Sequence, residues 1–271
     1  MLAAGIIVFR EVLEAALIIG IVLAATRGVA GSRRWVAMGI GGGLSGAMVV
    51  AASADALSAA LAGIGAELFN AAILLLAVTM LAWHNAWMSR HGREMVIAMK
   101  AVGHAVAMGA RPLSVLAVVV GVAVLREGAE TVLFLYGVAT SGDEGVALTA
   151  MGCAIGLVTG AGVGALLYFG LLAIPTRHLF AVTSGLVTLL AAGMAAQAVH
   201  FLGAAGVIET SADPVWDSSA ILAEDSLPGR LLHTLVGYVD QPTAAQLAAY
   251  VVTLVAITAM ARMVRTADRR A

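Results

Sequence analysis

Two short runs place an arginine and two glutamates inside stretches that are otherwise apolar. The first is Arg10-Glu11-Val12-Leu13-Glu14, and the second is Arg126-Glu127-Gly128-Ala129-Glu130. A charged side chain at the centre of a bilayer costs about 3 kcal/mol on insertion scales, so an intramembrane charge is by default a candidate for function. Residues three apart share one face of a helix, which would point both glutamates of each run the same way.

Facing each other, the two runs would bring together four carboxylates and two guanidiniums, a cluster that is net negative and rich in oxygen. Such a donor set suits a hard or borderline cation. The alternative is that each arginine only neutralises its neighbours and pins two helices together, although buried ion pairs are weak evidence of stability. Because the run occurs twice, we favour a metal-binding site made of Glu11, Glu14, Glu127 and Glu130, with Arg10 and Arg126 as ion-pair support.

The remainder of the chain has the composition of a membrane protein. Its 271 residues are 61% hydrophobic and 11% charged, with a mean hydropathy of +1.00, whereas a soluble domain carries about 25% charged residues. The one cysteine, Cys153, excludes an intrachain disulfide and a paired-cysteine redox or zinc motif. No basic segment precedes the first apolar run, so we expect the first helix to stay in the mature protein.

Seven stretches have the length and composition of a membrane span, which needs about 20 mostly apolar residues. All five prolines fall at or beyond the ends of these stretches, as expected because proline breaks a helix interior. We therefore predict an all-α, polytopic membrane protein with transmembrane helices at residues 3–25, 36–61, 67–88, 113–138, 147–174, 179–203 and 246–263.

Charges alternate in sign along the connections between these helices. Basic residues follow the first, third, fifth and seventh helices, whereas acidic residues dominate after the fourth and the sixth. The positive-inside rule then places the N-terminus outside and the C-terminus in the cytoplasm, with the chain in the cytoplasmic (inner) membrane. The alternation also supports seven helices, because one missed or extra helix would break it.

The first six helices form two units of three, and each unit begins with one charged run and continues with a glycine-rich helix. An odd number of helices per unit inverts the second unit, and inverted repeats place a substrate site near the midplane. We interpret the glycines, which recur every four residues, as close helix packing rather than ligand contacts. The whole chain, 1–271, is then one transmembrane domain with repeat one at 1–90, repeat two at 112–203, an outer loop at 204–245 and helix seven at 246–263.

The outer loop is acidic, but it also contains large apolar and aromatic residues such as Trp216 and Tyr238. A purely disordered segment would lack such residues. We therefore expect a partly ordered cap with short helices. Its acidic residues could attract cations or dock a partner.

Both charged runs resemble the Arg-Glu-x-x-Glu signature of the oxidase-dependent iron permeases, and the resemblance extends over nearly the whole chain. The end of the sixth helix, Gly193 to His200, and the tract from Trp216 to Tyr250 are also similar to that family. The resemblance implies a transporter and not an enzyme, which imports iron while the glutamates of both runs ligate it and the arginines act as essential partners. Three further residues become second-tier candidates for the metal pathway: Glu67, His200 and Asp217.

The same resemblance implies a partner outside the cytoplasmic membrane that oxidises or delivers iron, namely a haem peroxidase, a cupredoxin-like protein or a copper oxidase. It implies no permanently bound cofactor, because iron, as Fe²⁺ or Fe³⁺, is the transported substrate. Membrane lipid is the expected surrounding, no nucleic-acid partner is expected, and homo-oligomerisation stays open.

Two other functions stay open. One is uptake of another divalent metal such as lead. The other is a haem-bearing membrane redox subunit that uses His84, His91 and His200, since the first two are seven residues apart and share a helix face. We interpret His84 and His91 instead as anchors at the cytoplasmic end of the third helix, together with Trp83 and Trp87.

Overall fold

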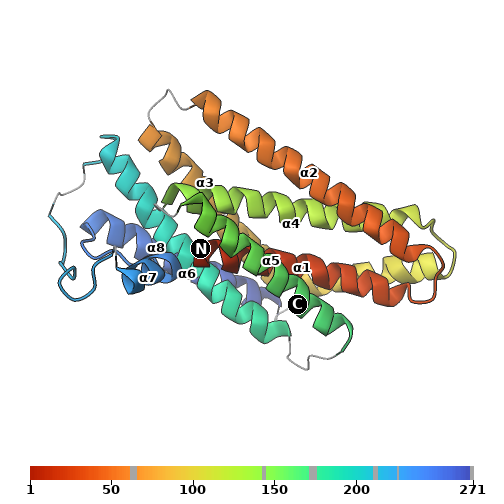
Figure 1. The fold of residues 1–271 in the computed structure, drawn as a ribbon. Helices are drawn as coiled ribbons and strands as arrows, with labels where there is room; N and C mark the ends of the chain where they lie inside the picture. The colour runs from red at the N-terminus through yellow and green to blue at the C-terminus, as the bar shows by residue number, and fades with distance from the viewer. Residues whose placement is uncertain (62–65, 142–144, 171–175, 210–212, 225, 269–271) are drawn as a thin grey trace.

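The computed structural model describes the chain apart from residues 62–65, 142–144, 171–175, 210–212, 225 and 269–271, and for some further helical residues it describes the backbone alone. The described ranges contain eight α-helices and no strand, which confirms the all-α prediction (Figure 1). The helices are α1 (Leu2–Ala25), α2 (Ser32–Leu61), α3 (Ala66–Ala107), α4 (Ser114–Ser141), α5 (Val146–Tyr168), α6 (Thr176–Ala204), α7 (Leu227–Val236) and α8 (Ala244–Asp268).

Five of these helices, α2, α3, α5, α6 and α8, contain a segment long and apolar enough to cross a membrane. Helices α1 and α4 are as long, at 24 and 28 residues, but each carries its arginine and two glutamates near the middle. The chain thus has the make-up of a multi-pass membrane protein. The count of seven spans and the orientation of the termini stay predictions.

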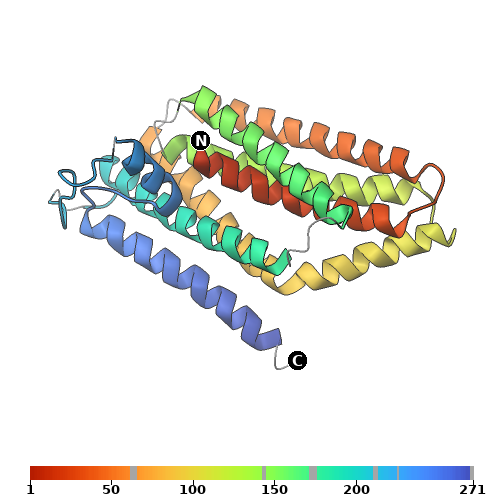
Figure 2. The ribbon, with the colours of Figure 1, turned by 60° about the horizontal axis from the view of Figure 1, so that its bottom comes forward.

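Helix α3 is much longer than predicted, and its expected end at residue 88 is wrong. The apolar run does end there, but Met99 and Val106, which are seven residues apart, pack against Val22 of α1 and Leu116 of α4. The helix therefore continues as an amphipathic segment until Gly109, whose φ of 73° breaks it. Figure 2 shows that α3 changes direction along its length.

Helix α5 is shorter than predicted. It ends at Tyr168 rather than at residue 174. Two residues later Gly170 takes a left-handed backbone conformation with φ of 71°, which an L side chain rarely adopts. The last predicted residues of this helix, 171–174, lie outside the described part of the chain.

The helices of the two predicted repeats pack crosswise. Helix α1 lies along α5, and α2 lies along α4 (Figures 1 and 2). The first helix of each unit thus packs on the second helix of the other unit. Helix α3 packs on α6, and α1 contacts α4 while running in the opposite direction.

Glycines permit these close pairings. A Cβ atom on Gly39 would lie 2.6 Å from the carbonyl oxygen of Ala117 in α4, and one on Gly160 would lie 2.8 Å from that of Phe9 in α1. The packing interpretation is therefore confirmed, except that Gly42 has nothing within 4 Å of its position. The glycines that face the neighbouring helix are Gly39, Gly43 and Gly46 in α2, and Gly152, Gly156, Gly160 and Gly164 in α5.

Two apolar cores lie along the bundle, and the charged runs fall between them. One core joins α1, α3, α4, α6 and α8 through residues such as Ile7 and Phe134. The other joins α1, α2, α3 and α4 through residues such as Val22 and Val124. Along α1 the first run follows Ile7 and precedes Val22, while along α4 the second run follows Val124 and precedes Phe134.

The segment between α6 and α8 folds as a cap that contains the short helix α7, which confirms the prediction of a partly ordered cap, while its place outside the membrane stays a prediction. The side chain of Ser226 accepts a hydrogen bond from the Gly229 amide at 3.1 Å and so caps α7, and Gly237, with φ of 69°, ends that helix. The hydroxyl of Tyr238 donates to the carbonyl oxygen of Leu222 at 2.9 Å. These contacts close the segment on itself at one end of the bundle (Figure 1).

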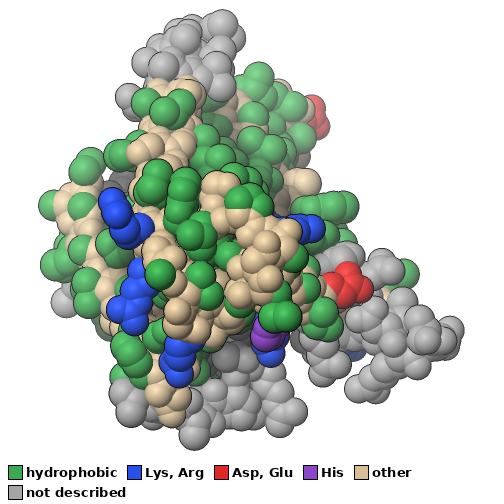
Figure 3. Space-filling view, turned by 90° about the vertical axis from the view of Figure 1, so that its right-hand side faces the viewer, with side chains coloured by type: hydrophobic (Ala, Val, Ile, Leu, Met, Phe, Trp, Pro, Cys, Tyr) green, Lys and Arg blue, Asp and Glu red, His purple; other side chains and the backbone are tan. Residues whose placement is uncertain are grey.

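The opposite end of the bundle, where α1 ends and α2 begins, is basic. Figure 3 faces this end, where lysine and arginine side chains stand out and acidic side chains appear only toward the edges of the view. The exposed basic residues near it are Arg27, Arg33, Arg34, Lys100 and Arg111.

We expect Gly156→Ala to destabilise the pairing of α5 with α1. The added Cβ would contact the backbone of Gly5 and lie 2.9 Å from the amide nitrogen of Phe9, and overpacking of this kind costs about 1–3 kcal/mol. Gly162→Ala is the matched control, because its Cβ has nothing within 4 Å and alanine is the better helix former. The melting temperature of the purified protein should fall for Gly156→Ala alone. Equal melting temperatures would contradict the pairing.

Candidate metal centre

The two charged runs meet inside the bundle, where α1 and α4 contact each other and α3 packs against both. Arg10, Glu11 and Glu14 are 2%, 1% and 3% exposed, and Glu127 is 3% exposed. Leu13, which lies between the glutamates of the first run, is fully buried. Four carboxylates therefore face one another in an interior that is otherwise apolar.

His84 of α3 stands between the two helices that carry the runs. It is 3% exposed, its Nε2 lies 3.4 Å from Oε2 of Glu14, and its Nδ1 contacts Oε2 of Glu130. Ligand atoms of Glu11, His84, Glu127 and Glu130 all lie within 4.8 Å of one another. We call these four residues together with Glu14 the glutamate–histidine cluster.

The two arginines hold equivalent glutamates in equivalent ways. Arg10 Nε donates to Oε1 of Glu14 at 3.1 Å, and Arg126 Nε donates to Oε1 of Glu130 at 3.0 Å. In each run the arginine therefore occupies one carboxylate oxygen and leaves Oε2 facing His84. These two hydrogen bonds fix the direction in which the carboxylates of Glu14 and Glu130 point.

Several polar atoms of the cluster are buried without a well-formed hydrogen bond, although His84 lies within ion-pair distance of Glu14 and Glu130. They are Oε2 of Glu11, Glu14, Glu127 and Glu130, both ring nitrogens of His84, and Nη1 of Arg10. Buried polar atoms are satisfied in the large majority of cases, so such a concentration requires an explanation. Carboxylate oxygens with one imidazole nitrogen match the preferences of a divalent first-row cation such as iron or manganese.

The cluster is closed on one side and partly open on the other. The side chains of Arg10 and Glu14 are 3% and 2% exposed, whereas those of Arg126 and Glu130 are 32% and 13% exposed. Trp87 of α3 covers Arg126, with the guanidinium carbon 4.3 Å from the ring centroid. Because α1 and α4 run in opposite directions, the two arginines lie on opposite sides of the carboxylates along the bundle.

The three second-tier candidates do not join the cluster. Glu67 is exposed in the first turn of α3. His200 is exposed near the end of α6, with its ring centroid 6.0 Å from that of Phe201. Asp217 is exposed in the cap, where the Ser219 hydroxyl and amide donate to it and hold its pKa below the usual value.

One acidic residue of the cap is paired within the cap. Oε1 of Glu224 lies 3.0 Å from Nδ1 of His233, and this contact holds the pKa of Glu224 below its ordinary value. The backbone amide of Glu224 in turn donates to the Asp240 carboxylate at 3.1 Å. These acids therefore hold the cap together as well as making it negative.

The interpretation of His84 and Trp87 as interfacial anchors is wrong. Since α3 continues to residue 107, His84 lies in the middle of a helix and belongs to the cluster, and Trp87 covers Arg126. Only Trp83, at 70% exposure, faces outward as expected. The signal that could have identified His84 is that it is an ionisable residue within a predicted span, well away from that span's first turn.

Comparisons with known proteins agree on one family. The family model described as the iron permease FTR1 family matches residues 1–268. The protein named ferrous iron permease EfeU of Escherichia coli O6:H1 is 31% identical over 255 residues, which cover 92% of this chain and 91% of the relative. Its namesake in Shigella flexneri is 33% identical over 190 residues, 70% of this chain and 80% of the relative.

A relative in Escherichia coli K12 is 32% identical over 190 residues, which cover 70% of this chain and 68% of the relative. Its name marks it as an inactive ferrous iron permease. No solved structure matches the chain significantly. The chain is thus similar to two proteins named as ferrous iron permeases and to one whose name marks it as inactive.

We expect a divalent cation to stabilise the protein through the cluster. A ligand that binds only the folded state stabilises it by about 2.7 kcal/mol at 100 times its dissociation constant, so Mn²⁺ or anaerobic Fe²⁺ should raise the melting temperature. Glu11→Gln or Glu127→Gln should abolish most of this rise because each removes a charged ligand. Glu67→Gln is the matched control, since Glu67 is exposed outside the cluster. The site is misassigned if all three variants keep the rise.

Proposed function

The chain belongs to the iron permease FTR1 family, and from that premise we propose that it imports iron across the cytoplasmic membrane through the glutamate–histidine cluster. The observation that carries this proposal is a buried set of carboxylate and imidazole ligand atoms within 4.8 Å of one another. Its acidic members come from two separate helices that carry the same motif. No other described group of histidine, cysteine, aspartate or glutamate residues has such a geometry.

The proposed architecture is a pair of inverted repeats of three helices, followed by a seventh transmembrane helix. The crosswise pairing of α1 with α5 and of α2 with α4 supports it, because a two-fold axis that exchanges the repeats would exchange these pairs. The same axis would exchange α1 with α4 and α3 with α6, and the two helices of each of these pairs are in contact. In such folds the substrate site lies near the midplane between the repeats, which is where the cluster would lie.

The proposed orientation places the cap outside and the basic end in the cytoplasm. Exposed arginines and lysine gather where α1 ends and α2 begins (Figure 3), and cytoplasmic loops carry an excess of such residues. Iron would then enter from the side of the acidic cap. A partner that oxidises or delivers iron, such as a haem peroxidase, a cupredoxin-like protein or a copper oxidase, would meet the cap there.

We propose iron(II) as the bound species, with the donor set as the argument for a first-row metal and the names of the relatives as the argument for the ferrous state. Carboxylates alone suit hard ions such as Ca²⁺ and Mg²⁺, whereas an added imidazole favours first-row transition metals. His84 is therefore proposed as a ligand alongside Glu11, Glu14, Glu127 and Glu130. The relatives named above are called ferrous iron permeases, which agrees with this choice.

The two arginines are proposed to act in turn as barriers on the two sides of the ion. Arg10 lies on the cap side and is buried, whereas Arg126 lies on the basic side and is 32% exposed. A cation leaving the cluster would be repelled by the guanidinium on its way unless that arginine swings aside. We therefore propose that this conformation is closed toward the cap and nearer to opening on the basic side.

The alternative of a haem-bearing redox subunit finds no support in the described histidines. His84 lies about 27 Å along α3 from the start of that helix, at 1.5 Å per residue, while His200 is near the cap end of α6. The side chain of His91 lies outside the described residues. Uptake of another divalent metal uses the same ligands and is separated by competition in the experiment that follows.

Uptake of radioactive iron into proteoliposomes tests the function. Loss of a residue that only supports a ligand costs about 10–100-fold in metal affinity, so Glu→Gln at any cluster glutamate should reduce uptake at low iron at least as strongly. His84→Leu should reduce it as well, while Glu67→Gln should not. Unlabelled Mn²⁺ and Pb²⁺ serve as competitors. Undiminished uptake in all four glutamate variants would disprove transport through the cluster, and stronger competition by lead than by iron would change the substrate.

Thiol labelling tests which side is open. In a Cys153→Ser background, Trp87→Cys should react with a membrane-impermeant methanethiosulfonate added to the basic side, and iron should slow the reaction. Ile7→Cys is the control for the closed side, because Ile7 is 1% exposed between the cluster and the cap. It should stay unlabelled from either side. Labelling of Trp87→Cys from the cap side only would reverse the assignment.

A further inference from the structure

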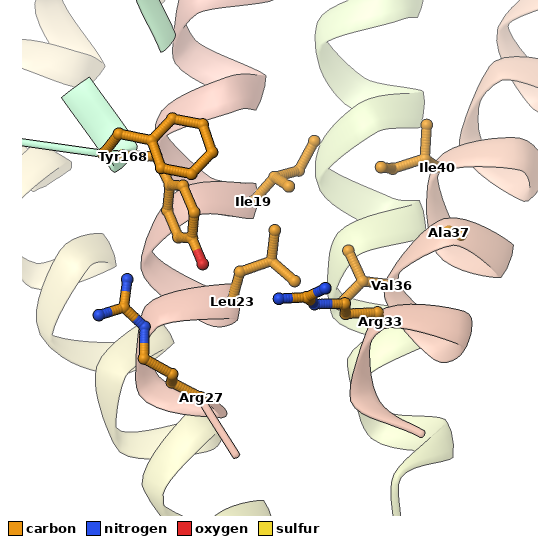
Figure 4. A pocket seen from close by; sticks show the side chains of 9 residues that line it. Ile19, Leu23, Arg27, Arg33, Val36, Ala37, Ile40 and Tyr168 are labelled. Atoms are coloured by element: carbon orange, nitrogen blue, oxygen red, sulfur yellow. The ribbon is translucent and has the colours of Figure 1, made fainter. Parts of the chain in front are cut away.

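A groove opens between the end of α1 and the start of α2, beside the last turn of α5. It has a volume of about 630 Å³. It exists because α1 packs on α5 while α2 packs on α4, so that the two helices diverge from their connection. Its walls are mostly apolar and include Phe169; Figure 4 labels the other apolar wall residues, Ile19, Leu23, Val36, Ala37 and Ile40.

Two arginines stand at one end of this groove, on opposite walls. Arg27 lies in the turn just after α1, and Arg33 lies at the start of α2 (Figure 4). The Arg27 guanidinium carbon lies 5.8 Å from the centroid of the Tyr168 ring, which holds this side chain against the groove. Neither arginine forms an ion pair with an acidic residue that the structure describes.

The groove therefore combines a doubly positive end with an apolar length. From Arg27 to Ile19 the helix rises about 12 Å, and from Arg33 to Ile40 about 10 Å. Both helices lead from the basic end of the molecule toward its apolar middle. A ligand that fits would carry a negative charge at one end and a hydrocarbon chain at the other.

We propose that this groove binds an acidic phospholipid, with its phosphate between Arg27 and Arg33 and an acyl chain along Ile19 and Ile40. Basic pockets between transmembrane helices on the cytoplasmic side are suited to such headgroups. A free phosphate would occupy only the arginine end and leave the apolar walls without a partner. The lipid would bridge the α1–α5 and α2–α4 pairs at the point where they separate. Its binding does not depend on iron transport.

Native mass spectrometry of the full-length protein, released from micelles containing equal amounts of phosphatidylglycerol and phosphatidylcholine with the same acyl chains, tests the proposal. The wild type should retain phosphatidylglycerol with a preference of about tenfold, since each basic residue near a membrane surface favours anionic lipid. The double variant Arg27→Gln/Arg33→Gln should retain both lipids equally. Arg34→Gln is the matched control, because Arg34 is exposed on the same turn but does not line the groove.

A second variant keeps both charges and fills the apolar part instead. Ala37→Trp should lose phosphatidylglycerol as well, because the larger side chain would fill the groove. This variant tests the proposal if the double arginine variant fails to fold. Three results would overturn the proposal: no preference in the wild type, equal loss in Arg34→Gln, or retention of the lipid by Ala37→Trp. Displacement of the lipid by inorganic phosphate alone would identify a free-anion site instead.

Discussion

Four carboxylates facing one another in an apolar interior are the constraint on which the rest of this molecule depends. Coulomb repulsion between them is strong in a medium of low polarity, and moving them out of water adds a further cost. The protein offsets part of this with Arg10 and Arg126, each bonded to one oxygen of its own glutamate. His84 shares the remaining oxygens of Glu14 and Glu130. Oε2 of Glu11 and Oε2 of Glu127 stay buried without a hydrogen-bond partner among the described residues, and in the proposed function a cation would supply the positive charge.

The close helix pairs make this arrangement possible. The charged runs can meet only if α1 and α4 are held at a fixed depth and rotation, and each is held by a glycine-rich partner rather than by its own neighbour in sequence. Gly39 and Gly43 bring α2 onto the backbone of α4, while Gly156 and Gly160 bring α5 onto that of α1. The two apolar cores lie on either side of the cluster and keep water from most of it, except beside Arg126 and Glu130. Favourable packing elsewhere in the bundle thus offsets the free energy that burying the charges costs.

Much of this could be predicted from the sequence, because the cost of an intramembrane charge does not depend on the details of packing. The glutamates and arginines of both runs were identifiable for that reason, and the helices were placed by apolar runs and prolines. The sequence does not place His84 in the site, because its apolar run ends at residue 88 whereas the helix continues to residue 107. The segment after residue 88 is polar on one side, yet Met99 and Val106 on its other side pack against α1 and α4. That a helix continues as an amphipathic segment becomes evident only when the helices against which it packs are known.

The difference between the two arginines could not have been predicted at all. The runs are nearly identical, so any argument from residue types assigns Arg10 and Arg126 the same surroundings, whereas the structure buries one and leaves the other 32% exposed beneath Trp87. An exact two-fold arrangement would open or close both sides of the cluster together. A transporter must never open both sides of its site at once, and a site that stayed closed on both sides would trap its ion. For the proposed transport, two equivalent motifs in unequal surroundings would satisfy both requirements, because exchanging the surroundings of the two arginines would exchange the open side without altering the ligands. The duplication would then provide two conformations around one site.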